Sequence, residues 1–324
     1  MMMCSLPILK LNDAITSVIA KIKSLDIQDS IKKGLNPEVQ IVDKDGRSLT
    51  TIAEIIDLGN TISETRYCVK ISATYAQFLW LLCDIAFRIN DSIAIQNEFE
   101  QLNEEEKKDF IFHLKDNTPE SHYLSELSDM ESVFSYCTDS ILIISKLLNG
   151  MLTDKEMDDL YNYDMTGIIG PRVNSLYVYA TSFILLHEFS HYYLNHDFSG
   201  DGSYEEETEA DQEAFWSMYS DLEDKEKRTA MRGILCALVS LIFINKDLQD
   251  DSIHPKPVER IFQYYEYLKC DGQDYSALLC YLFYAWAVYT NDMDMPKHNG
   301  CKSYPELLNK IKKHLLDKED LSHR

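Results

Sequence analysis

The residues best suited to chemistry in this chain lie in the segment His187-Glu188-Phe189-Ser190-His191. Histidines four positions apart share one face of a helix, one turn apart, so both imidazoles can reach a single metal ion. Glu188 lies beside that face, where it can take the proton from a metal-bound water and act as general base. Zinc suits nitrogen ligands and lowers the pKa of its water. The segment therefore predicts a hydrolytic Zn²⁺ site, and the alternative is two histidines with a structural role only.

A third protein ligand is expected, because catalytic zinc keeps three protein ligands and one open position. The candidates are Glu207, Asp197 and His196. The segment 199–202 contains two glycines, which permit the chain to reverse tightly. Two antiparallel helices joined in this way would bring Glu207 close to the level of His191. We therefore expect Glu207 to complete the site, with Asp197 and His196 as alternatives.

Asp211 follows Glu207 by four residues and so lies on the same face of the next expected helix. A metal-bound histidine needs an acceptor for its other ring nitrogen, and a carboxylate can also hold a nearby arginine. Asp211 could do either. The alternative is an ordinary surface aspartate.

The order of these segments resembles that of known zinc peptidases. HExxH followed by Glu207-Thr208-Glu209-Ala210-Asp211 looks like the HExxH and ExxAD pattern of the gluzincins. Downstream, the segment 254–261 reads HPKPVERI and is similar to the HP-x(4)-R-I segment of the HtpX and CAAX-prenyl-protease group. That resemblance implies that His254 stabilises the tetrahedral intermediate and that Arg260 is the partner of Asp211.

The first part of the pattern also resembles the ImmA/IrrE peptidases, and the soluble phage-exclusion peptidases of the Lit type are similar in being cytoplasmic HExxH proteins. The resemblance covers residues 177–268. HtpX-type proteins have membrane spans and a longer gap between HExxH and ExxAD, and this chain has neither. Membrane-protein substrates are therefore not implied.

The elements that must position these residues are mostly helices, and we expect a mainly α protein with a small β portion (α+β). The catalytic half would be zincin-like, built on an HExxH helix and an antiparallel ExxAD helix. We expect an N-terminal α+β region of unknown role at 1–170 and a helical catalytic region at 171–324, with one compact domain as the alternative. Apolar spacing and breakers predict strands at 39–47 and 66–71 and helices at 11–25, 72–89, 174–196, 204–220, 228–245, 257–268, 275–289 and 304–317.

Composition narrows the class of protein. The chain has 324 residues and a formal net charge of −23, which disfavours a nucleic-acid partner. Its longest apolar runs, 234–244 and 277–289, are too short to span a bilayer and are expected to be buried helices. The N-terminus lacks the pattern of an export signal, so we expect a cytoplasmic protein with reduced cysteines.

Together these features predict a cytoplasmic zinc endopeptidase that acts on a protein or peptide substrate. Glu188 would be the general base, and the chain would have no membrane span. The analogy with Lit and ImmA/IrrE suggests a defence or toxin-like protease that cuts a specific cellular protein. The alternative is a catalytically silent zinc-binding regulator or interaction protein on the same scaffold. The oligomeric state is left open by the sequence.

Overall fold

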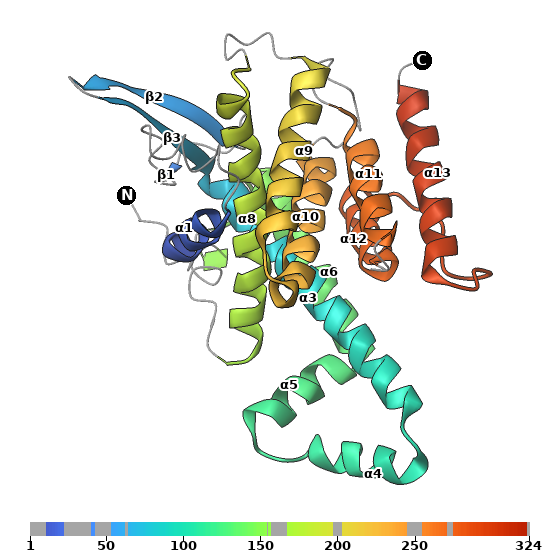
Figure 1. Ribbon diagram of the computed structural model, residues 1–324. Coiled ribbons are helices and arrows are strands. Elements are labelled where there is room, and N and C mark those ends of the chain that lie inside the picture. Colours follow the sequence, from blue (N-terminus) through green and yellow to red (C-terminus); the bar gives the residue numbers. More distant parts are fainter. Residues whose placement is uncertain are drawn as a thin grey trace.

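The computed structural model describes residues 11–22, 40–42, 53–61, 64–153, 155–156, 167–196, 203–244, 255–270 and 275–322. The protein is mostly helical, as predicted (Figure 1). The helices are α1 (Asn12–Lys21), α3 (Ala73–Gln101), α4 (Glu104–His113), α5 (Pro119–Ser128), α6 (Met130–Leu148), α8 (Ile169–Tyr193), α9 (Tyr204–Asp221), α10 (Asp224–Ile244), α11 (Pro257–Cys270), α12 (Ser276–Thr290) and α13 (Tyr304–Ser322).

The β structure of the described residues is one three-stranded sheet with the order β1-β3-β2. β2 (Ala53–Thr61) and β3 (Glu64–Ser72) pair antiparallel, with a register shift between Asp57 and Asn60. β1 (Gln40–Val42) pairs parallel with β3. The strand predicted at 66–71 lies within β3, and the one predicted at 39–47 corresponds to β1 only at 40–42, since 43–47 lie outside the described residues. β2 was not predicted.

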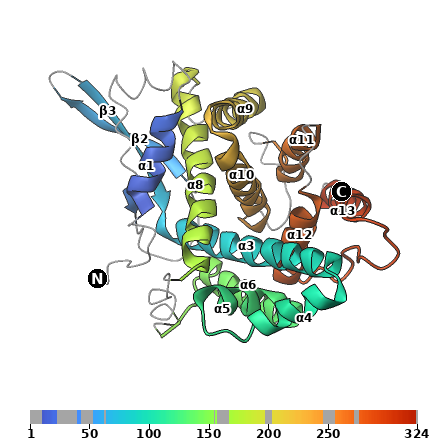
Figure 2. The ribbon, with the colours of Figure 1, turned by 60° about the horizontal axis from the view of Figure 1, so that its bottom comes forward.

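Helix α8 occupies the centre of the molecule. In Figure 1 and Figure 2 it lies between α1 on one side and α9 with α10 on the other, and it packs against all three. Most of its residues from Val173 to Leu186 are buried, so the helix is apolar on nearly every face. A helix of this kind is fixed by packing on all sides, and it can therefore hold functional side chains at its end in place.

Helix α10 crosses α8 at very short range through Gly233. A β-carbon added at Gly233 would lie 2.8 Å from the carbonyl oxygen of Leu176 and 2.9 Å from the amide nitrogen of Ala180. Only glycine lets the two backbones approach this closely, and any side chain would force the helices apart.

The apolar runs predicted to be buried helices lie in α10 and α12, and both predictions are confirmed. Among the described residues, no helix is both long enough and apolar enough to cross a bilayer. Cys83, Cys137, Cys236 and Cys280 are buried free thiols.

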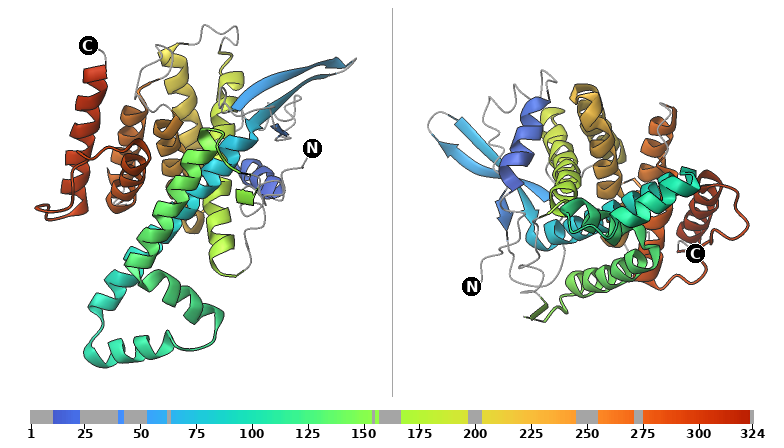
Figure 3. Two further views of the ribbon diagram at one scale, coloured as in Figure 1. Left: turned by 180° about the vertical axis from the view of Figure 1, so that it is seen from behind. Right: turned by 90° about the horizontal axis from the view of Figure 1, so that it is seen from below.

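One hydrophobic cluster extends from Ile15 to Leu315 and includes residues on both sides of the predicted boundary at position 170. Helices α3 and α6 lie side by side and lead to α4 and α5, which project from the body (Figure 1 and Figure 3). The division into 1–170 and 171–324 stays a prediction.

The helix predicted at 174–196 is wrong at both ends, because α8 runs from Ile169 to Tyr193. It begins just after Gly167, whose φ of +89° suits glycine. Pro171 is tolerated because it lies in the first turn, where its missing N–H costs nothing. The segment 167–171, which contains the predicted boundary after residue 170, therefore marks the start of the central helix.

Candidate active site

The C-terminal end of α8 carries His187 and His191. The helix closes with a hydrogen bond from the His196 amide to the His191 carbonyl at 2.9 Å and one from the Asn195 amide to the Tyr192 carbonyl at 3.2 Å. Asn195 takes the left-handed conformation, with φ of +58°. These bonds form a Schellman motif, in which asparagine is the usual substitute for glycine. The reversal brings the side chain of His196 back toward His191.

Helix α9 begins at a capping box formed by Ser203 and Glu206. The hydroxyl of Ser203 accepts a hydrogen bond from the Glu206 amide at 3.2 Å, and the Ser203 amide donates to the Glu206 carboxylate at 2.8 Å. The helix packs along α8 and runs antiparallel to it (Figure 1). Glu207 lies in its first turns, where the helix dipole favours a carboxylate. The side chain of Glu207 is buried and faces the two histidines.

The side chains of His187, His191 and Glu207 converge closely enough to hold one metal ion. The two Nε2 atoms are 3.1 Å apart. The Glu207 carboxylate oxygens lie 3.4 Å from Nε2 of His187 and 3.3 Å from Nε2 of His191. Ligands bonded at about 2.0–2.2 Å to a tetrahedral zinc lie about 3.3–3.6 Å apart. The two histidines approach different oxygens of the Glu207 carboxylate, and each of these distances is close to the spacing of two ligands on one zinc. Two imidazoles and a carboxylate are a donor set that fits zinc.

Asp211 ties His187 to Arg260. Its Oδ1 lies 2.9 Å from Nδ1 of His187. Arg260, one turn into α11, donates from Nε to Oδ2 at 2.6 Å and from Nη2 to Oδ1 at 2.7 Å. This is the bidentate geometry of a strong guanidinium–carboxylate pair. If a metal occupied Nε2, the ring proton of His187 would be on Nδ1, within 2.9 Å of Asp211, which would then orient the ring.

The opposite charges of this buried cluster stabilise one another. Burial alone would lower the pKa of His187, but the Asp211 and Glu207 carboxylates outweigh it and raise that pKa to about 10. Burial would raise the pKa of Asp211, yet Arg260 and His187 hold it below its usual range. In the absence of a metal, a proton on His187 supplies the positive charge that the carboxylates require.

His191 has a hydrogen-bond chain of its own. Its Nδ1 lies 2.9 Å from Nδ1 of His196, and Nε2 of His196 lies 3.3 Å from a carboxylate oxygen of Glu209. If a metal occupied Nε2, His191 would donate its Nδ1 proton to His196, which would donate to Glu209 from its other nitrogen. Each histidine of the cluster is therefore oriented by its own acceptor. His196, an alternative third ligand from the sequence, contacts His191 instead.

A family model described as Peptidase U49 matches residues 69–289, which is more than half of the chain. The chain belongs to the Peptidase U49 family. A search of curated proteins and a search of solved structures each returned no match.

The site of this U49 peptidase gathers residues from three helices. Glu188 is partly exposed on α8, and its charge helps to raise the pKa of His187. His254 and Asp197 lie outside the described residues, so the role expected for His254 stays a prediction. The interaction of His196 with Glu209 was not predicted. The signal for it was Asn195, a residue that tolerates the left-handed conformation needed for the reversal.

Membership of a peptidase family implies a protein or peptide substrate and a hydrolase activity. It does not name a metal. The matched residues include every described member of the cluster, from His187 on α8 to Arg260 on α11.

Proposed function

We propose that this U49 peptidase is a zinc-dependent endopeptidase of the gluzincin type, with His187, His191 and Glu207 as the metal ligands. The observation that carries the proposal is the convergence of these three side chains at the ends of two packed helices. The two Nε2 atoms are 3.1 Å apart, and the two oxygens of the Glu207 carboxylate lie 3.4 and 3.3 Å from them. Two imidazoles and a carboxylate are a ligand set of catalytic zinc sites, which leave the fourth position open.

A bound Zn²⁺ would lower the pKa of a water in that open position and polarise the peptide carbonyl. Glu188 follows His187 directly and comes from the same turn of α8, so it is placed to accept the proton of the attacking water. It would then pass that proton to the amine that leaves. A base of this kind contributes roughly 10²–10⁴-fold to the rate.

The remaining residues orient the ligands. Asp211 holds the ring of His187, and Arg260 holds Asp211 and balances its charge in the buried cluster. The resemblance to peptidases with the HP-x(4)-R-I segment supports His254 as the donor to the developing oxyanion. A positioned oxyanion donor is worth about 2.7–4 kcal/mol in other enzymes.

The test is a comparison of cells that express the intact protein, Glu188→Gln and Glu205→Gln, with mapping of the new N-termini that appear in cellular proteins. Glu205 is an exposed acid at the start of α9 and supplies a matched control. We expect the same cleavages from the intact protein and the Glu205 variant, and none from Glu188→Gln, although the purified Glu188 variant still binds one zinc. Full cleavage by Glu188→Gln would contradict the role of the base. Zinc bound by all three proteins with no cleavage by any would favour the catalytically silent regulator.

A further inference from the structure

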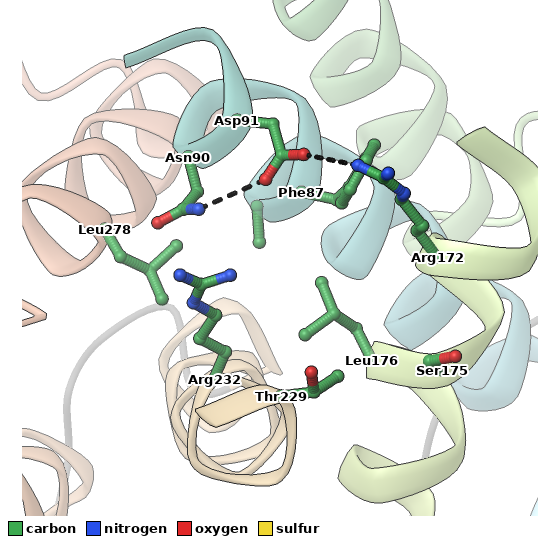
Figure 4. Close-up of a pocket in the computed structure, with 10 residues that line it drawn as sticks. Phe87, Asn90, Asp91, Arg172, Ser175, Leu176, Thr229, Arg232 and Leu278 are labelled. Carbon is green, nitrogen blue, oxygen red and sulfur yellow. Dashed lines mark hydrogen bonds and ion pairs between the residues drawn. The ribbon is translucent and has the colours of Figure 1, made fainter. Parts of the chain in front are cut away.

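A second candidate site lies at the other end of α8. A cavity of about 260 Å³ opens between α3, α8, α10 and α12 (Figure 4). Leu176 lines it from α8 and lies eleven residues before His187, or about 16 Å along the helix axis. The cavity is therefore separate from the metal cluster and is not explained by the proposed peptidase chemistry.

The side chain of Arg232 extends from α10 into this cavity, and Figure 4 shows its guanidinium pointing toward Asn90 and Leu278. Its Nε atom is shielded from solvent and has no hydrogen-bond partner among the described residues. Among the residues that the structure describes, no carboxylate forms an ion pair with Arg232. Arg232 as a whole is partly exposed, but a buried guanidinium N–H without an acceptor is costly because it has lost its hydrogen bond to water. A cavity next to such a group is therefore suited to an anion.

Among the described residues that line the cavity, the only acid is Asp91, and it already has partners. Its carboxylate accepts hydrogen bonds from Arg172 at 3.2 Å and from Asn90 at 3.3 Å, and also from the hydroxyl of Tyr123. Arg172 balances the charge of Asp91, so the described part of the lining keeps one net positive charge, that of Arg232. The whole chain has a net charge of −23, which means that any attraction for an anion is local to this cavity.

The rest of the lining is largely apolar, with Ala86, Phe87, Leu176 and Leu278 around the guanidinium. One positive charge beside an apolar wall matches a ligand with one negative charge on an apolar body. A guanidinium binds a carboxylate with two parallel hydrogen bonds. At roughly 30 Å³ for each water, the volume corresponds to about nine waters, which is room for a small organic molecule. We propose that this cavity binds a small organic monocarboxylate through Arg232.

The proposal is tested with benzoate, which has a single carboxylate on an apolar ring and is small enough for the cavity. Benzamide supplies the uncharged analogue, and inorganic phosphate supplies an anion without an apolar body. Binding to the full chain is followed by NMR titration of the leucine methyl groups that line the cavity. Because a carboxylate can also bind to zinc, each titration is run on zinc-loaded protein and again with a chelator.

We expect benzoate to shift the methyl signals of Leu176 and Leu278, and each shift should be the same in zinc-loaded protein and in the presence of the chelator. Arg232→Gln should weaken this binding at least about tenfold, which corresponds to the loss of a charge-assisted hydrogen bond. Arg228→Gln makes the same change of charge at an exposed position one turn earlier on α10 and should bind as the native protein does. Thr229→Trp fills the cavity, leaves Arg232 in place and should abolish binding.

Equal binding of benzamide would overturn the proposal, because the guanidinium would then play no part. Binding of phosphate without benzoate would overturn the choice of a monocarboxylate, and binding that disappears with the chelator would place the ligand on the metal. If Arg232→Gln does not fold, the Thr229 variant decides, since native-like binding by it would exclude this cavity. None of these outcomes depends on peptidase activity, so the proposed function and this site can fail separately.

Discussion

Removal of the charge of Asp211 is the sharpest test of the buried cluster. Asp211 is 2% exposed, and the side chain of Arg260 is 10% exposed. They are joined by two hydrogen bonds, at 2.6 and 2.7 Å, so the pair is bidentate and largely removed from solvent. Breaking a buried pair by removing one partner costs about 3–5 kcal/mol. In Asp211→Asn the amide oxygen still accepts one hydrogen bond, so we expect the low end, about 3 kcal/mol of unfolding free energy.

The loss is measured by urea unfolding of the metal-free protein, followed by circular dichroism in the presence of a chelator. A chain of this length loses about 2 °C of Tm for each kcal/mol, so a fall of about 6 °C should accompany it. Glu205→Gln removes an exposed acid from the same helix and should change stability by less than about 0.5 kcal/mol.

A double-mutant cycle with Arg260→Met separates the pair from its surroundings. Asp211→Asn leaves Arg260 without its carboxylate, and Arg260→Met leaves Asp211 with His187 alone, whereas the double variant removes both members of the pair. The double variant should therefore cost less than the sum of the two singles, by at least about 1 kcal/mol. A loss under about 1 kcal/mol in Asp211→Asn, or strict additivity in the cycle, would refute the buried ion pair as described.

Three further outcomes follow from the geometry. Gly233→Ala should destabilise the protein by about 1–3 kcal/mol in urea unfolding, because its β-carbon meets the α8 backbone, and a neutral or stabilising result would contradict the close crossing. His196→Phe should weaken zinc binding about 10–100-fold in a competition titration with a chromogenic chelator. Glu209→Gln should have a smaller effect, since that side chain is 64% exposed, and equal losses from the two would argue against the proposed chain of hydrogen bonds. Ser203→Ala should lower the free energy of unfolding by about 1 kcal/mol through loss of the N-cap. No change would mean that the N-cap contributes nothing to stability.

The candidate site was predictable where its geometry is local. The spacing of His187 and His191 fixes them on one helical face, whatever the rest of the fold does. The capping box at Ser203 sets the start of α9, and a short reversal between two helices then brings Glu207 to the level of His191. To predict the positions of these three residues, only helix periodicity and the length of the connection between the two helices were needed.

Other features depend on tertiary packing and escaped prediction. The end of α8 at Tyr193 rests on Asn195 in a left-handed conformation, which many asparagines never adopt. The contact between His196 and His191 follows from that single φ angle. Helix α3 was predicted to end at residue 89 but continues to Gln101, because its later turns join the projecting arm of α4 and α5. The exposure of Arg232 to a cavity requires four helices to be placed together, which no local pattern encodes.

The central claim is that one zinc ion is held by His187, His191 and Glu207, and anomalous diffraction at the zinc edge from crystals of the zinc-loaded protein tests it most directly. We expect one strong anomalous peak per chain, about 2.0–2.2 Å from Nε2 of each histidine and from a carboxylate oxygen of Glu207. A zinc peak bound elsewhere, or histidine rings that turn away from each other in the loaded protein, would contradict it.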